Sequence, residues 1–405
     1  MKILHTADWH IGKKLHKQDL TEDFSLFIQW LCEEIEQHQV EVLLVSGDVF
    51  DLANPSNEAK RLYYQSLLKL KNLGLQIIIT GGNHDSPSML NAPQAILNEL
   101  NVQVVGNLPE NFEDVMIPIA SKHGNIEAVV AAIPFLRNND VQSAEVAKTY
   151  EERLENLKNA IANYYTQAAE LAKSNFPGVP CIAMGHLFTH GVQTSESERD
   201  IQIGNQAGVE ALHFGEYFSY VALGHIHQPQ QVKAKIPIYY SGSPVQLSFS
   251  ERKDQKRVLL IDTKNACEPT SITVPTFRQL ITLKGNIAEI EYKLMNLTPN
   301  AQLPYFIEIE LVEEKYNPQI VFLLNNLMEN FQTKGYTIVK HRILFQEKQK
   351  GLSAIVQPKQ NLEEMKAKDV FEKRIADTEL SLEQKQQLMS NFELLLQEVE
   401  GNEYL

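Results

Sequence analysis

Short apolar runs alternate with polar clusters over the first 265 or so residues of the chain. Most runs are rich in Val, Ile and Leu, and helical spacing follows several of them, as in Phe24, Phe27 and Leu31. This order predicts strands that alternate with helical crossovers, in a sheet covered on both faces. The predicted strands are 2–7, 42–46, 76–80, 128–133, 181–184, 220–223, 238–240 and 258–261, and a long helical stretch covers 145–174. We therefore expect an α/β sandwich over residues 1–265, with its loops gathered at the strand ends.

The pattern changes at residues 265–276, where the apolar alternation lapses and Pro269 and Pro275 appear. We place a domain boundary there. Beyond it, alternating strand and helix patterns predict a compact α+β module over 276–350. Its expected elements are a strand at 277–283, a helix at 287–295, a strand at 305–312, a helix at 320–331 and a strand at 336–344.

A third pattern follows Pro358 and predicts a helical tail over 358–405. Ser381 and Gln384 form a possible capping box ahead of one apolar stripe, and a weaker stripe lies upstream. The stronger stripe contains Leu388, Phe392, Leu395, Leu396 and Val399, and the weaker one Leu362, Met365, Phe371 and Ile375. These helices either dock on their own domain or present their apolar faces to a partner helix.

Composition places the chain among ordinary globular proteins, since 43% of its residues are apolar and 22% are charged. No stretch approaches the ~18 apolar residues of a membrane span, and the N-terminus lacks the features of a secretory signal, so we expect a cytoplasmic protein. The 3 cysteines are widely spaced and fit neither a disulfide framework nor a thiolate zinc site. A net charge of −14 argues against a nucleic-acid binder, although divalent cations in a carboxylate-rich site would locally reverse the sign.

Metal-ligand residues stand at the ends of five predicted strands, most of them next to a glycine. The clusters are Asp8-Trp-His10, Gly47-Asp48, Gly82-Asn-His-Asp85, Gly185-His186 and Gly224-His-Ile-His227. Each cluster alone is a weak signal, but coincidence explains the ordered set poorly. Because open α/β sheets bind ligands outside the carboxyl ends of their strands, the five clusters should converge in space. Oxygen and imidazole ligands without thiolate suit manganese, magnesium, iron or zinc, and the large number of ligands favours two ions bridged by a carboxylate.

This ordered set resembles the calcineurin-like metallophosphoesterase superfamily. More narrowly, residues 5–12, 46–51, 82–86 and 242–249 resemble the SbcD family, the nuclease subunits of bacterial SbcCD DNA-repair complexes. The resemblance implies a two-sheet αββα sandwich, followed by a small α+β capping domain and a C-terminal helical hairpin. It also implies two divalent ions, with manganese preferred and magnesium as the alternative. Asp8, His10, Asp48 and His227 would hold one ion, Asp48, Asn83, His186 and His225 would hold the other, and Asp48 would be the bridge.

His84 is adjacent to a ligand but surplus to coordination, so we expect it to stabilise the transition state or to protonate the leaving oxygen. Asp51, three residues after the expected bridge, would orient His84 and keep it protonated, as in related phosphatases. The alternative for Asp51 is a turn-forming carboxylate. Candidate DNA contacts are Lys13, Lys14, Lys17, Arg252 and Lys253, for which solvated surface positions are the alternative.

The resemblance further implies a nuclease that acts on DNA ends as an exonuclease and on hairpins or single strands as an endonuclease, in DNA repair and recombination. Its partner would be an SbcC-type coiled-coil ATPase bound by the C-terminal helices, and a homodimer within a heterotetramer is expected. A phosphatase or phosphodiesterase for small phosphoesters would share every metal ligand and fits the acidic charge better, but it needs neither the additional module nor the tail. A metal-free scaffold is disfavoured because all the ligand side chains are present.

Overall fold

The structure, a computed structural model, describes residues 1–121, 123–137, 139–141, 149–198, 208–314, 317, 319–331, 335–345, 371, 375, 381 and 384–392. These residues divide into two compact units. The larger unit contains Met1–Leu311 and Val321–Arg342, and the smaller unit contains the other described residues. Among the described residues, no helix is both long and apolar enough to cross a membrane.

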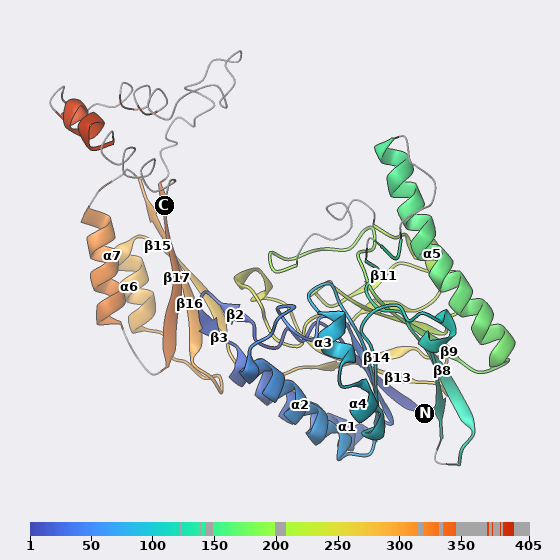
Figure 1. Cartoon of the computed structure of the whole chain (residues 1–405). Helices are drawn as coiled ribbons and strands as arrows, with labels where there is room; N and C mark the ends of the chain where they lie inside the picture. Colours follow the sequence, from blue (N-terminus) through green and yellow to red (C-terminus); the bar gives the residue numbers. More distant parts are fainter. Residues whose placement is uncertain are drawn as a thin grey trace. The chain divides into compact units, whose positions relative to one another are not determined.

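Two six-stranded sheets form most of the larger unit (Figure 1). The first has the order β14-β13-β1-β4-β5-β6, and the second has the order β11-β12-β10-β9-β8-β7. The strands of the first sheet are β1 (Lys2–Thr6), β4 (Val42–Ser46), β5 (Gln76–Thr80), β6 (Val102–Val105), β13 (Arg257–Asp262) and β14 (Pro269–Thr273). Those of the second are β7 (Met116–Ala120), β8 (Ile126–Ala132), β9 (Cys181–His186), β10 (Tyr220–Gly224), β11 (Gln230–Val232) and β12 (Ile238–Tyr240). A two-stranded ribbon, β2 (Lys14–Leu15) and β3 (Gln18–Asp19), lies outside both sheets.

Helices cover the outer face of each sheet. The helices are α1 (Thr21–His38), α2 (Asn57–Lys71), α3 (Pro87–Asn91) and α4 (Gln94–Glu99) beside the first sheet, and α5 (Tyr150–Asn175) beside the second. Phe27 and Leu31 of α1 are fully buried against the first sheet, as the helical spacing predicts. Ile161 and Tyr165 of α5 are buried in the same way against the second sheet. The predicted αββα sandwich is therefore confirmed.

The inner faces of the two sheets share a separate apolar core. Ile3, Leu44 and Ile78 from the first sheet belong to it together with Val130 and Ile182 from the second, and all five are fully buried. Strands buried on both faces explain the nearly continuous apolar runs in the sequence. Because β1, β4 and β5 run parallel, as do β8, β9 and β10, the loops after them gather at common sheet edges.

Six strands were missing from the sequence prediction. The short strands β2, β3 and β11 and the strands β6 and β7 were not recognised, and β14 lies inside the stretch 265–276, where a boundary was expected. β14 pairs antiparallel with β13 and continues the first sheet to Thr273. It is an edge strand without a fully buried residue, so it lacks the apolar alternation that would have announced it.

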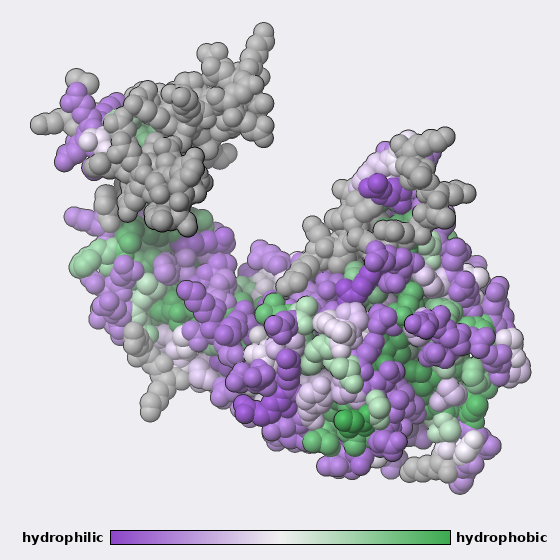
Figure 2. All heavy atoms as spheres, viewed as in Figure 1, coloured by the Kyte–Doolittle hydropathy of each residue, from purple (hydrophilic) through white to green (hydrophobic). Residues whose placement is uncertain are grey.

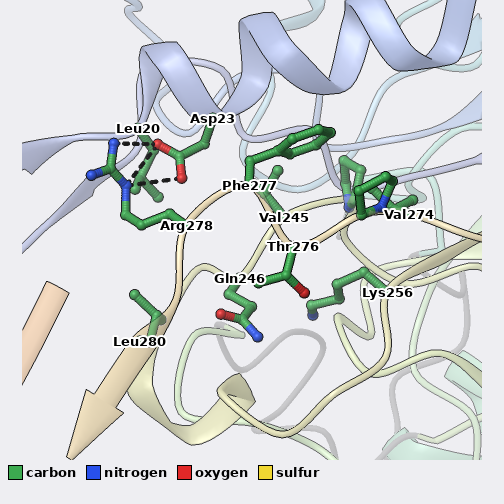
Figure 3. A pocket seen from close by; sticks show the side chains of 12 residues that line it. Leu20, Asp23, Val245, Gln246, Lys256, Val274, Thr276, Phe277, Arg278 and Leu280 are labelled. Carbon is green, nitrogen blue, oxygen red and sulfur yellow. Dashed lines mark hydrogen bonds and ion pairs between the residues drawn. The ribbon is translucent and has the colours of Figure 1, made fainter. Parts of the chain in front are cut away.

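The α+β module follows the predicted order of elements. It contains β15 (Leu280–Gly285), α6 (Ile287–Met295), β16 (Tyr305–Glu313), α7 (Gln319–Asn330) and β17 (Tyr336–Phe345), with the strands in the order β15-β16-β17. Asn286 and Glu289 form a capping box at the start of α6. In the larger unit, the Arg278 guanidinium joins the start of this module to α1 through a buried ion pair with Asp23, drawn in Figure 3.

Part of the tail is described, within the smaller unit. Residues 384–392 are helical, and the predicted capping box is confirmed because Gln384 N–H donates to Ser381 Oγ (3.3 Å) and Ser381 N–H donates to Gln384 Oε1 (3.0 Å). The ring centroids of Phe371 and Phe392 are 3.8 Å apart, so residues from the two predicted stripes contact each other. The remaining stripe residues Leu362, Met365, Leu395, Leu396 and Val399 lie outside the described residues, as does most of the expected hairpin.

Hydrophilic side chains dominate the face of the molecule drawn in Figure 2, with hydrophobic residues scattered among them.

Candidate metal centre

Six of the seven predicted ligands lie in the loops after β1, β4, β5 and β10, and His186 is the last residue of β9. Several of these loops have an unusual backbone: Asp8, His10, Asp48 and His225 all have a positive φ. Non-glycine residues in this region are strained, and such strain clusters at functional sites. Gly82 is required for a different reason, because a Cβ there would lie 2.1 Å from Asp48 Oδ1.

One group of donor atoms consists of Asp8, His10, Asp48 and His227. The Nε2 atoms of His10 and His227 lie 3.1 Å apart, and Asp48 Oδ2 is 3.5 Å from His10 Nε2. Asp8, His10 and His227 each place one ligand atom within 4.8 Å of the others. All four side chains are buried. The first predicted ligand set is therefore brought together.

A second group consists of Asp48, Asn83, His186 and His225. His186 Nε2 lies 2.8 Å from Asn83 Oδ1 and 3.4 Å from the same Asp48 Oδ2. Asn83 Oδ1 is also 3.3 Å from His225 Nδ1. Since a carbonyl oxygen can only accept, the 3.0 Å contact of His186 Nδ1 with Ser46 O puts a proton on Nδ1, and Nε2 is the ring nitrogen that faces these oxygens. Asp48 belongs to both groups.

Several observations show that these residues fit bound cations. Asp8 Oδ2 and His225 Nε2 are among the buried atoms of the described residues that lack any hydrogen bond. Buried polar atoms are normally satisfied, so an unpaired carboxylate oxygen and ring nitrogen in one cluster indicate a missing partner. Carboxylate, amide and imidazole donors without thiolate suit a hard or borderline divalent ion.

The pKa values point the same way. Burial raises the pKa of the Asp8 carboxyl to about 7, so its ionised form lacks compensating charge in the protein alone. Burial opposes ionisation of Asp48 too, but His186 and His10 hold its pKa well below the usual value. Burial would lower the pKa of His186, whereas Asp48 and Asp8 raise it to about 9. Protons on imidazole therefore supply the positive charge that bound cations would otherwise provide.

His84 lies against the first group, with its ring centroid 4.7 Å from that of His10. Its Nδ1 donates to the main-chain carbonyl of Asp51 over 2.7 Å, so Asp51 orients His84 through its backbone. The Asp51 carboxylate contacts His10 Nδ1 at 3.3 Å and Lys13 Nζ at 3.1 Å. Burial opposes ionisation of this carboxylate, but His10 and Lys13 hold its pKa below the usual value. The carboxylate thus supports a predicted ligand, a role that the sequence did not indicate.

The predicted basic residues lie on two neighbouring loops. The ring of His16, between Lys14 and Lys17, is 5.9 Å from that of Phe249, and an Arg252 guanidinium nitrogen donates to Phe249 O over 2.8 Å. Lys14, Lys17, Arg252 and Lys253 are exposed, whereas Lys13 is paired with Asp51. Four of the five candidates are thus accessible to a polyanion.

Sequence reasoning missed the polar groups behind His227. Ser197, Glu198, Glu251 and Lys256 surround it and contact its ring or its main chain. Glu251 and Lys256 are buried although charged, and neither burial nor pairing can be read from isolated residues in loops. A weak signal was present, because Glu251 closely follows residues 242–249 of the resemblance.

Comparison with known proteins agrees with this geometry. The family model for calcineurin-like phosphoesterases matches residues 1–229, and a model described as the type 5 capsule protein repressor C-terminal domain matches residues 276–379. The SbcD component of the nuclease SbcCD from Escherichia coli K12 is 32% identical over 411 residues, which cover 99% of each chain. The protein of the same name from Rhodobacter capsulatus is 38% identical over 288 residues, covering 68% of this chain and 69% of the relative. That from Bacillus subtilis is 34% identical over 275 residues, covering 67% and 68%. The chain therefore belongs to the calcineurin-like phosphoesterases, and within them to the SbcD family.

Proposed function

We propose that this chain is a DNA nuclease subunit that hydrolyses phosphodiester bonds with two divalent cations and acts with an SbcC-type ATPase in DNA repair and recombination. The observation that carries the proposal is the convergence of seven donor side chains from five strand ends, six of them buried and Asn83 half-buried. Asp48 Oδ2 lies 3.5 Å from His10 Nε2 and 3.4 Å from His186 Nε2. The full-length similarity to a component of a nuclease named SbcCD supports DNA as the substrate class.

In this proposal, one cation is held by Asp8, His10, Asp48 and His227 and the other by Asp48, Asn83, His186 and His225. Manganese is the proposed metal and magnesium the alternative. Bound in pairs, such ions lower the pKa of water and offset negative charge on a phosphodiester. The protein fixes the ligands before substrate arrives, because hydrogen bonds to Ser46 O and Asn83 Oδ1 hold the His186 ring on both sides.

His84 is the proposed catalytic residue outside the ligand set. Since its Nδ1 donates to Asp51 O, the ring has a fixed orientation and its Nε2 is the atom that would contact the phosphate or the leaving oxygen. A protonated Nε2 would stabilise negative charge or deliver a proton.

Lys14, Lys17, Arg252 and Lys253 are the proposed DNA contacts, because the His16–Phe249 contact places their two loops side by side. Exposed lysine and arginine would bind the phosphate backbone without reading sequence. The C-terminal helical segment is the proposed site for the coiled-coil ATPase, within an assembly that contains two copies of this chain.

The experiment is manganese-dependent cleavage of end-labelled linear and hairpin DNA by the full chain, with and without the ATPase and ATP. A small chromogenic phosphodiester serves as the comparison substrate, and Asp48→Asn serves as the metal-site control. We expect DNA cleavage that increases with the partner and disappears in the variant. Turnover of the small ester with DNA left intact, even with the partner present, would contradict the proposal.

A further inference from the structure

A buried ion pair lies directly behind His227 and belongs to neither ligand group. Lys256 Nζ is 2.6 Å from Glu251 Oε2, and the exposed fractions of the two residues are 5% and 0%. Lys256 Nζ also donates to the main-chain oxygen of His227 over 2.9 Å. Charged side chains are seldom buried so completely unless the pair has a specific task, since desolvation offsets most of their attraction.

The imidazole of His227 is connected to this ion pair through Ser197. Ser197 Oγ lies 2.6 Å from His227 Nδ1 and also forms a hydrogen bond with Glu251 Oε1. A serine hydroxyl has one proton, so it can donate to only one of these two neighbours. Its third neighbour, Ser195 Oγ at 2.7 Å, can itself donate and therefore does not need that proton. The direction of the chain of hydrogen bonds therefore depends on whether Glu251 accepts or donates.

Glu251 is surrounded by donors, so it can only accept. Its Oε2 accepts from the Lys256 ammonium over 2.6 Å and from the Leu247 N–H over 3.2 Å. Its Oε1 accepts from Ser248 Oγ over 3.1 Å. A carboxylate paired with an ammonium and bonded by donors on both oxygens has no proton to give, so Ser197 donates to Glu251 and accepts from His227. His227 must then have its proton on Nδ1, which leaves the Nε2 lone pair facing His10 Nε2 at 3.1 Å.

The main chain of His227 is held by the same set of residues. Its N–H donates to Glu198 Oε1 over 2.8 Å, while Lys256 binds its carbonyl oxygen. Ring and backbone are thus fixed together. A histidine that binds a metal through one nitrogen depends in this way on the hydrogen bond of its other nitrogen, which sets both tautomer and orientation.

We propose that Ser197, oriented by Glu251, is a positioning residue that fixes the Nδ1-protonated tautomer of His227 and so presents Nε2 to a divalent cation. The proposal deepens the proposed function, since it concerns one ligand of the same metal centre. Ser197 touches neither substrate nor cation in this scheme and acts only through His227.

The first test is manganese affinity, measured by titration calorimetry on the full chain without DNA. Ser197→Thr keeps the hydroxyl, whereas Ser197→Val has a similar shape to threonine without it and leaves no space for a replacement water. We expect Ser197→Val to weaken one of two binding events by roughly 10–100-fold and Ser197→Thr to bind within a few fold of the parent protein. Ser248→Ala is the matched control, because Ser248 Oγ also bonds Glu251 Oε1 (3.1 Å) but does not contact His227.

The second test reads the tautomer itself, from ¹⁵N shifts of histidine-labelled, metal-free protein, with His227→Asn identifying the signal. We expect the Nδ1-protonated form in the parent protein. In Glu251→Gln, the Lys256 ammonium would retain the amide oxygen, so the amide nitrogen would face Ser197 and donate to it. Ser197 would then donate to His227 Nδ1, and we expect the signal to switch to the Nε2-protonated form.

An unchanged His227 tautomer in Glu251→Gln, or equal manganese affinity in Ser197→Val and Ser197→Thr, would overturn the proposal. These results are independent of nuclease activity. If the parent protein cleaves DNA but the variants keep affinity and tautomer, the positioning role fails and the proposed function stands. If the variants behave as expected but the parent protein leaves DNA intact with its partner, the proposed function fails and the positioning role stands.

Discussion

The Nε2 atoms of His10 and His227 lie 3.1 Å apart, although 217 positions separate the two residues in the sequence. In the protein alone, one of the two ring nitrogens can donate its proton to the lone pair of the other. A cation bound by His10, His227 and the unpaired oxygen of Asp8 would take the place of that proton and would also give the Asp8 oxygen a partner. The folded protein therefore holds an arrangement that is completed by metal, and metal should stabilise it measurably.

We expect manganese to raise the free energy of unfolding and a chelator to lower it. At a free concentration of about 100 times the dissociation constant, each site contributes about 2.7 kcal/mol, because the ion binds the folded state only. Urea denaturation with manganese and with EDTA measures the difference. Asp48→Asn should lose most of the manganese effect, since Asp48 Oδ2 contacts ligands of both groups. A variant stabilised as strongly as the parent would exclude Asp48 as the bridge.

His84→Ala should lower the rate of hydrolysis but leave metal binding nearly unchanged. One ring nitrogen lies within 4.8 Å of ligand atoms of His10 and Asp48, but the ring belongs to neither proposed ligand set and its Nδ1 donates to Asp51 O, so we expect two manganese ions to bind with nearly unchanged affinity. Hydrolysis should fall by roughly 10²–10⁴-fold, the usual contribution of a positioned acid or base. Metal content and DNA cleavage are measured on the same preparation. Equal loss of metal in His84→Ala and Asp48→Asn would contradict this division of roles.

The sequence was most informative where metal-ligand residue types stand at the carboxyl ends of predicted parallel strands. Parallel strands bring their carboxyl ends to one edge, so Asp8, Asp48 and His186 could be expected to meet although they are far apart in the chain. Helix α6 was also predicted with its observed bounds, because Asn286 and Glu289 mark its start and the apolar spacing is regular. At these positions, the structure favoured by the local sequence is the one found in the folded protein.

The sequence was least informative about residues whose role depends on distant partners. Glu251 and Lys256 resemble ordinary surface charges until the fold buries both beside His227. Asp51 shows the same limit: its expected contact with His84 runs through the main-chain carbonyl, and its carboxylate contacts His10 and Lys13. Loop conformation decides these contacts, and spacing along the chain does not encode it.

Arg278→Ala should destabilise the chain by about 3–5 kcal/mol, because it would leave the Asp23 carboxylate buried without a partner. The guanidinium binds both oxygens of Asp23 (Figure 3). It also lies 4.0 Å from the centroid of the Phe306 ring and donates to Pro304 O, so a lysine ammonium cannot reproduce all of these contacts. Urea denaturation of Arg278→Ala and Arg278→Lys measures the loss.

The double variant Asp23→Asn/Arg278→Met is the control for this pair. It removes both charges and keeps most of the buried volume, so it should be more stable than Arg278→Ala. A double variant as unstable as the sum of its two single variants would show that Asp23 and Arg278 contribute independently.

Acid sensitivity should arise in part from His5, which is completely buried between the sheets with its Nδ1 3.0 Å from the Tyr220 hydroxyl. Burial lowers the pKa of His5 to about 3. The unfolded chain titrates near a pKa of about 6.5, so it binds a proton that the folded protein refuses between these values. The contribution of His5 to the free energy of unfolding is therefore present in full above pH ~6.5. It decreases as the pH falls and is smaller by about 2 kcal/mol at pH ~5.

His5→Gln should reduce this pH dependence, because the amide can still bond the Tyr220 hydroxyl but does not titrate. The free energy of unfolding is measured at pH ~7.5 and pH ~5 for the parent and the variant, and we expect the difference between the two pH values to be smaller in the variant by about 2 kcal/mol. Tyr220→Phe removes the same hydrogen bond but retains His5, so its pH dependence should match that of the parent. If His5→Gln lost as much stability on acidification as Tyr220→Phe, the acid-sensitive group would have to lie elsewhere. His225, a buried histidine of the proposed metal centre whose pKa is also lowered by burial, would be the next to test.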